Sequence, residues 1–307
     1  MNWVFDLLAA TLRNATPLVY GTTGEVYTER SGVLNLGIEG TMYAGAFAGF
    51  AVAYGTGSLL LGLLAAIVAG LGAGALMAFL TVTIGANQHV SGLGLTIGLV
   101  GLCEFANRLM FTERSSTQLA HVEPFAVWDP LAGLGDIGTT FAQYGLTYVA
   151  FLVVVPVAAW VLARTPLGLS IRAVGEDPEA ADSAGISVAR VRYLALMIGG
   201  ALMAVGGAFL TLAVLGTFTL DIIAGRGWVC IALVIFGRWR IGRGVLGALL
   251  FSFVYSLGLR LQIMDGWSAI PPEVMLALPY LAVIAALAIS GRNVAYPGAY
   301  LKPYRRS

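Results

Sequence analysis

Long apolar runs, interrupted by few charged side chains, constrain this chain more than any other feature. About nine runs reach or approach the roughly 20 residues that a helix needs to cross the hydrocarbon core of a bilayer. They cover residues 5–24, 36–54, 58–82, 90–111, 144–163, 191–215, 222–237, 243–260 and 273–290. The runs are continuous and do not alternate as membrane strands do. We therefore predict an all-α polytopic membrane protein, with residues 1–307 forming a single transmembrane domain.

Composition agrees with a membrane-embedded chain. Hydrophobic residues make up 58% and charged residues 11%, whereas a soluble domain contains about 25% charged residues. The net charge of +1 gives no indication of a nucleic-acid partner. Cys103 and Cys230 lie in apolar runs without further metal ligands at suitable spacing, so we expect no metal site. Close helix packing is predicted at the Gly-x-x-x-Gly pairs Gly45/Gly49, Gly70/Gly74 and Gly94/Gly98.

Basic residues predict how the chain is oriented, because cytoplasmic loops are enriched in Lys and Arg. They cluster in three places: Arg164, Arg172, Arg190 and Arg192; Arg238, Arg240 and Arg243; and Arg292, Lys302, Arg305 and Arg306. We expect all three on the cytoplasmic side. The segments 112–143 and 261–272 then face outward, with the N-terminus outside and the C-terminus inside. The first of them is either a solvated loop or a docking face for an extracytoplasmic partner.

The inner connection, residues 164–190, contains a short polar helix. Asp177 is a good N-cap residue, and Pro178 suits the first helical position because it has no N–H to leave unpaired. Gly185 is placed to end the turn. The helix is either an ordinary interfacial helix or a protrusion that a cytoplasmic motor protein grips.

These residues resemble a known motif. Glu179-Ala180-Ala181-x-x-x-Gly185 is similar to the Glu-Ala-Ala-x-x-x-Gly coupling loop of ABC importer permeases. Residues 173–186 resemble its form in the branched-chain amino acid, ribose and nucleoside permease superfamily. Residues 15–47, with Glu29-Arg30-Ser31-Gly32 and the stretch 35–40, resemble the N-terminal signature of the nucleoside, basic membrane protein-associated permeases. Residues 225–239 resemble their second signature. The similarity is collinear over most of the chain.

The resemblance implies a type II-like permease subunit of an ABC importer in the bacterial plasma (inner) membrane. It implies a nucleoside or similar small polar solute, an ABC ATPase subunit, an extracytoplasmic binding lipoprotein and a second, different permease. The coupling residues would be Glu176, Asp177, Pro178, Glu179, Ala180, Ala181 and Gly185. The chain has no P-loop motif of its own, so we expect ATP hydrolysis on separate chains, and we expect no cofactor. The acidic character of segment 112–143 departs from the family pattern.

Two apolar segments with embedded polar residues suggest a transport path. Segments 33–46 and 218–231 are weakly alike, and paired broken helices place solute paths near the membrane midplane in secondary transporters. The candidate path residues are Asn35, Glu39, Thr219, Asp221 and Arg226. Other interpretations stay open: chance similarity of the segments, an Asp221–Arg226 ion pair, and a Glu39 side chain that reaches the interface.

An ion-coupled secondary transporter or a channel without an ATPase is the alternative function. Such a protein requires midplane acids or a polar pore lining. This chain has few such residues, and the polar helix in 164–190 would have no purpose there.

Overall fold

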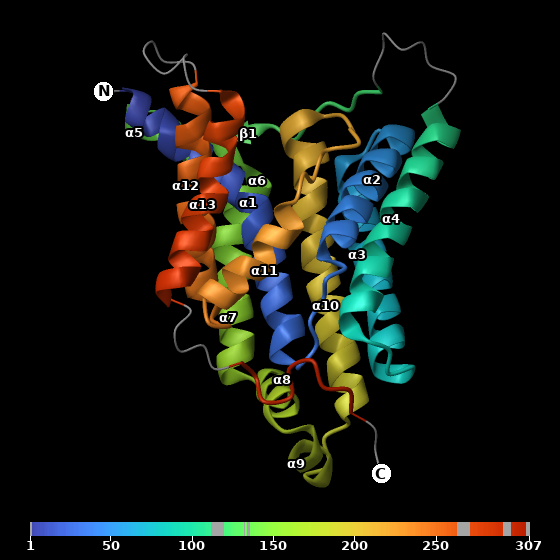
Figure 1. Ribbon diagram of the computed structural model, residues 1–307. Coiled ribbons are helices and arrows are strands. Elements are labelled where there is room, and N and C mark those ends of the chain that lie inside the picture. The colour runs from blue at the N-terminus through green and yellow to red at the C-terminus, as the bar shows by residue number, and fades with distance from the viewer. Residues whose placement is uncertain are drawn as a thin grey trace.

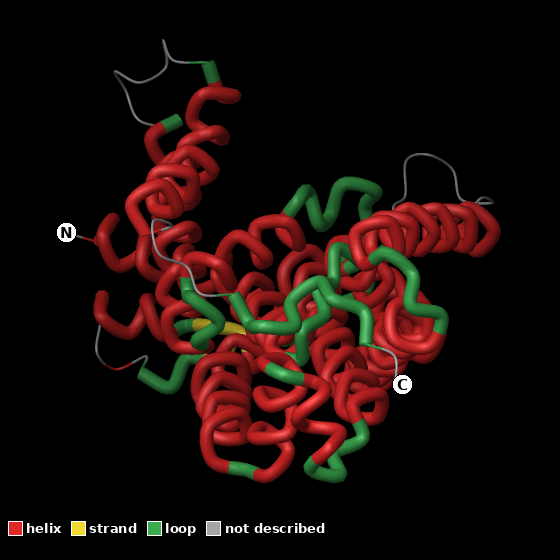
Figure 2. The backbone as a smooth tube through the Cα atoms, turned by 60° about the horizontal axis from the view of Figure 1, so that its bottom comes forward, coloured by secondary structure: helices red, strands yellow, loops and turns green. Residues whose placement is uncertain are grey.

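The computed structural model describes residues 2–111, 120–131, 133, 136–262, 271–290 and 296–304. Helices make up most of this backbone. A two-stranded antiparallel pair, β1 (Val127–Trp128) with β2 (Gln143–Tyr144), lies in the long connection between residues 112 and 144 (Figure 2). The predicted all-α architecture is confirmed for these residues.

The helices follow the predicted apolar runs, and several continue into π-helical turns. In the first half they are α1 (Asn2–Arg30), α2 (Ile38–Thr56), α3 (Leu59–Ala78, continuing to Thr83), α4 (Gln88–Phe111), α5 (Asp136–Phe141), α6 (Gly145–Tyr148) and α7 (Val155–Arg164). In the second half they are α8 (Pro166–Glu176), α9 (Pro178–Ser183), α10 (Val188–Phe209, continuing to Leu215), α11 (Arg226–Phe236), α12 (Ile241–Leu261) and α13 (Pro272–Ser290).

Five helices of the described residues are long and apolar enough to cross a membrane: Leu59–Thr83, Gln88–Phe111, Gly145–Arg164, Val188–Leu215 and Ile241–Leu261. The predicted count of about nine crossings is not confirmed and stays a prediction. The segment 222–237 shows why the sequence count differs. Its helix α11 has 11 residues, and at 1.5 Å per residue it spans only about half of the hydrocarbon core.

The long helix α10 lies at the centre and packs against α1, α2 and α3 (Figure 1). Glycines permit this packing. A Cβ atom on Gly207 of α10 would lie 1.8 Å from the Met42 carbonyl oxygen, and one on Gly70 would lie 2.3 Å from the Gly200 carbonyl oxygen. The predicted close packing is confirmed at Gly45/Gly49 and Gly70/Gly74. It is wrong for Gly94/Gly98, where added Cβ atoms would meet no heavy atom within 4 Å.

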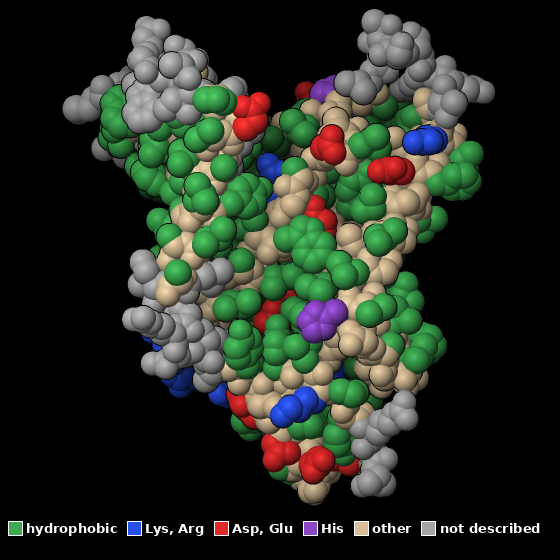
Figure 3. Space-filling model, viewed as in Figure 1, with side chains coloured by type: hydrophobic (Ala, Val, Ile, Leu, Met, Phe, Trp, Pro, Cys, Tyr) green, Lys and Arg blue, Asp and Glu red, His purple; other side chains and the backbone are tan. Residues whose placement is uncertain are grey.

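The two ends of the bundle differ in character. The N-terminus, α5 and β1 lie at one end, and α9 lies at the other with the C-terminal residues 296–304 (Figure 1). Hydrophobic side chains cover much of the height between them, and acidic side chains gather at the α9 end (Figure 3). Which end faces the cytoplasm stays a prediction from the arginines. Residues 112–119, 263–270, Arg292, Arg305 and Arg306, which that prediction also used, lie outside the described residues.

Candidate functional site

Helix α9 has the capped form that the sequence predicts. The Asp177 carboxylate accepts hydrogen bonds from the backbone N–H groups of Glu179 (3.1 Å) and Ala180 (3.0 Å), and Pro178 occupies the first turn. Gly185 has a φ of +85° and follows the last turn, where the left-handed conformation favours glycine. The backbone N–H of Ile186 donates to the Ala181 carbonyl (3.0 Å) and closes the end of the helix.

Helix α9 presents one apolar face to the protein and an acidic face to its surroundings. Ala181 is buried, with 4% of its surface exposed. Glu176, Asp177, Glu179 and Ala180 are exposed. A six-residue helix that projects from the end of the bundle, with fixed caps and exposed acids, is a suitable contact for a cleft on another protein.

Helix α8 connects α9 to the end of α1. A Cβ atom on Gly175 would lie 2.0 Å from the Arg30 carbonyl oxygen, so the two backbones are in direct contact. Arg30 also forms an ion pair with Glu176 (3.9 Å) and donates from its Nε to the Trp239 carbonyl (3.0 Å). A displacement of α9 would therefore act on α1 and on the turn before α12.

A buried pair of acids lies close to this contact and was not predicted. Glu25 and Glu29 of α1 are fully buried, and one carboxyl oxygen of each has no hydrogen-bond partner among the described residues. The Asn35 backbone N–H donates to Glu25 (3.0 Å), and the Trp239 indole N–H donates to Glu29 (2.6 Å). The i,i+4 spacing of the two acids indicated only that they share one helix face.

The two predicted broken segments meet through Glu39. Its carboxylate, in the first turn of α2, accepts hydrogen bonds from the backbone N–H groups of Gly225 (2.8 Å) and Gly227 (2.7 Å). The first N–H groups of a helix have no bonding partner within the helix, so those at the N-terminus of α11 are available to this carboxylate. The helix dipole at this end also favours a negative charge. A Cβ atom on Gly227 would lie 2.7 Å from the Glu39 backbone, so glycine permits the approach.

The other predicted path residues have different environments. Asn35 is fully buried; its side chain accepts from the Gly37 N–H (3.0 Å) and donates to the Met203 sulfur (3.6 Å), so it supports the break before α2. Thr219 and Asp221 are exposed. Arg226 donates to the Ile222 and Ile223 carbonyls (3.0 Å each). Among the described residues, no ion pair joins Asp221 to Arg226.

A cavity of about 250 Å³ borders the turn before α11. It is lined by Asn14, Leu18, Ala224, Arg226, Phe251, Ser252, Tyr255 and Tyr280. The lining combines an amide, hydroxyl groups, a guanidinium and aromatic rings. The Ser252 hydroxyl is buried and has no hydrogen-bond partner among the described residues. A cavity with such groups suits a small polar solute that carries both hydroxyls and a flat ring.

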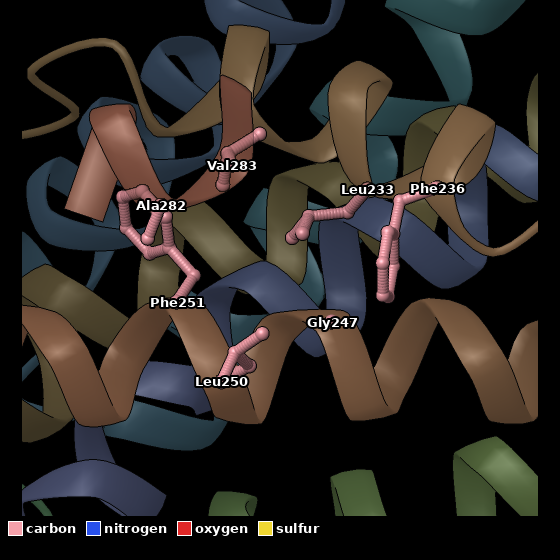
Figure 4. Close-up of a pocket in the computed structure, with 7 residues that line it drawn as sticks. All are labelled: Leu233, Phe236, Gly247, Leu250, Phe251, Ala282 and Val283. Carbon is pink, nitrogen blue, oxygen red and sulfur yellow. The ribbon is translucent and has the colours of Figure 1, made fainter. Parts of the chain in front are cut away.

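A neighbouring cavity between α11, α12 and α13 is of a different kind. Its lining is apolar: Leu233, Phe236, Gly247, Leu250, Phe251, Ala282 and Val283 (Figure 4). Its volume of about 10 Å³ holds one water molecule at most. It is a packing gap and no solute site.

The family model described as "Branched-chain amino acid transport system / permease component" matches residues 7–287. A putative glucose ABC transporter permease of Haloferax volcanii is 36% identical over 100% of this chain and 99% of its own length. A guanosine ABC transporter permease of Bacillus subtilis is 34% identical, over 92% of this chain and 90% of its own. A nucleoside ABC transporter permease of Lactococcus lactis is 32% identical, over 94% and 93%. No solved structure matches significantly.

Proposed function

The chain belongs to the permease family of branched-chain amino acid transport systems, and we propose on that basis that it carries a nucleoside or a similar small polar solute into the cell. It is the permease subunit of an ABC transporter and a multi-pass membrane protein. Family membership supports this role over an ion-coupled transporter or a channel. The bacterial plasma membrane is the location that we propose.

The observation that carries the coupling role is the exposed, doubly capped helix α9 at one end of the bundle. Residues 176–186 bind in a cleft of a separate ATPase subunit, which hydrolyses ATP. Closure of the ATPase displaces α9, and the direct contact of Gly175 with Arg30 passes the displacement to α1. The exposed carboxylates of Glu176, Asp177 and Glu179 favour a basic or hydrogen-bond-donating cleft.

The solute path lies at an interface with a second permease. This chain contributes the contact between its two broken segments, 33–46 and 218–231, which meet at Glu39. It also contributes the cavity beside Arg226. The exposed Thr219 and Asp221 lie on the same irregular segment. Backbone groups of this segment face a cavity without contact with lipid, which is the condition for irregular backbone within a membrane. One α9 serves one ATPase site, so a second permease chain supplies the other. A second copy of this chain would satisfy that count, and the resemblance to nucleoside-type systems favours a permease of a different sequence.

The solute class follows from the relatives and from the polar cavity. Two relatives are named for guanosine or nucleosides, which favours a nucleoside. A monosaccharide is the second candidate, because the relative that matches the whole chain at 36% identity is named for glucose. An extracytoplasmic binding lipoprotein would select the solute and deliver it.

Calorimetric titration of the partner binding protein with guanosine, glucose and leucine tests the solute class. We expect saturable binding of guanosine. Binding of glucose alone would select the second candidate. Binding of leucine alone would contradict both.

A further inference from the structure

The C-terminal segment, residues 296–304, lies across α8 beside the coupling end (Figure 1). Three backbone N–H groups attach it. Ala299 donates to the Gly175 carbonyl (2.8 Å), Gly298 donates to the Glu176 carboxylate (3.1 Å), and Leu301 donates to the Gly32 carbonyl (3.3 Å). The segment therefore binds both the last turn of α8 and the turn that follows α1.

This attachment leaves no space for side chains. A Cβ atom on Gly298 would lie 2.4 Å from the Glu176 carbonyl oxygen. Gly32 has a φ of +88°, and a Cβ atom there would lie 3.1 Å from the Ala299 carbonyl oxygen. The glycines on both sides of the contact permit backbone to lie directly on backbone.

Aromatic residues anchor the segment to the buried acids. The Trp239 ring contacts the rings of Tyr296 and Tyr300, with centroids 5.0 Å and 6.0 Å apart. The Trp239 indole N–H in turn donates to the buried Glu29 carboxylate (2.6 Å), so Trp239 joins the two tyrosines to the acids. Burial raises the pKa of Tyr300, so its hydroxyl stays protonated beside these acids.

The far end of the segment reaches α9 itself. The Tyr304 hydroxyl donates to the Asp182 carboxylate (3.1 Å), across 122 positions of sequence. Helix α9 has only six residues, so its orientation depends on contacts beyond its own caps. Tyr304 provides one such contact, and the rest of the segment connects it to α1 and to Trp239.

We propose that the C-terminal segment positions α9 against the ends of α1 and α12, so that ATPase movement reaches both rather than rotating α9 alone. Tyr304 is a positioning residue, because it acts through Asp182. This inference rests on the proposed coupling role of α9. Without the segment, α9 loses the Tyr304–Asp182 contact that joins it to α1 and Trp239, and part of its displacement is lost.

The test is the number of solute molecules transported per ATP hydrolysed by the complete reconstituted importer. Tyr304→Phe removes only the hydroxyl. We expect membrane insertion, assembly and ATP hydrolysis to be retained, and transport per ATP to fall about two- to tenfold, the size of effect that one hydrogen bond accounts for. Tyr193→Phe is the matched control. It removes a hydroxyl that bonds to Thr83 (2.6 Å), in the π-helical turn that continues α3, and not to the described residues 296–304.

The outcomes separate the inference from the function on which it rests. The inference is overturned if Tyr304→Phe and Tyr193→Phe transport the same number of solute molecules per ATP hydrolysed. So does loss of the ATPase subunit from the Tyr304→Phe complex, which would make the contact purely structural. Glu179→Lys, assayed in parallel, tests the coupling role itself. If Glu179→Lys transports normally, the proposed function fails as well.

Discussion

Asp221 and Asn35 differ in burial, and this difference separates a path residue from a supporting one. Asp221→Leu changes an exposed side chain, so we expect the free energy of unfolding to change by less than about 0.5 kcal/mol while uptake falls. Asn35→Leu removes two buried hydrogen bonds, so uptake and stability should fall together, stability by about 1–3 kcal/mol.

Uptake assays and thermal melts of the purified variants check this prediction. Asp221→Asn is the control, because it keeps the size and most of the polarity of the side chain. Normal uptake by Asp221→Leu would remove Asp221 from the path.

For single residues, the sequence predicted contacts with neighbouring residues better than contacts with residues far away in the chain. The spacing around Asp177 predicted its N-cap bonds correctly, because capping depends on neighbouring residues only. The partners of Glu39 could not be predicted, since Gly225 lies 186 positions away. Glu25 and Glu29 stand out in the sequence only as part of the signature in residues 15–47. Their burial depends on Trp239 and Tyr300, which tertiary packing alone brings to α1.

Among the elements, the packing of α10 depends on glycines that face neighbouring backbone. Gly207→Ala places a methyl group against the Met42 carbonyl oxygen, so we expect a loss of about 1–3 kcal/mol from overpacking. Gly72→Ala is the matched control on α3. Its added methyl meets nothing within 4 Å, and alanine favours the helix by up to about 1 kcal/mol.

Melting temperatures in detergent compare the two variants. We expect Gly207→Ala to melt lower than the wild type and Gly72→Ala to melt at the same temperature or higher. Equal melting temperatures would mean that the α2–α10 contact adjusts without cost.

The extent of the elements was predictable where a run of apolar residues ends at a cap or a turn. α2, α9 and α12 end close to the predicted limits. The start of the short α11 could not be predicted as well. The glycines and polar residues at 216–227 permit an irregular backbone, and the path of that backbone depends on its contact with Glu39. The Gly94/Gly98 pair shows the opposite error, since a packing motif in the sequence does not say which surface has a neighbour.

Across the whole molecule, the N-terminus and α9 lie at opposite ends of the bundle (Figure 1). With the arginines on the cytoplasmic side, this arrangement predicts that reporter fusions after residue 130 and after residue 180 report from opposite sides of the membrane. Alkaline phosphatase activity and fluorescence of the two fusions measure this. Signals from the same side would contradict the proposed orientation.

Transport driven by ATP hydrolysis through α9 is the central claim, and one measurement tests it directly. Uptake and ATP hydrolysis are recorded together in proteoliposomes that contain the complete importer, with wild type, Glu179→Lys, Gly185→Pro and the control Glu273→Lys at the opposite end. Glu179 is exposed on α9, and proline cannot adopt the φ of +85° at Gly185. We predict inserted protein without uptake for both α9 variants and normal uptake for the control. Full ATP-driven uptake by both α9 variants would contradict the account.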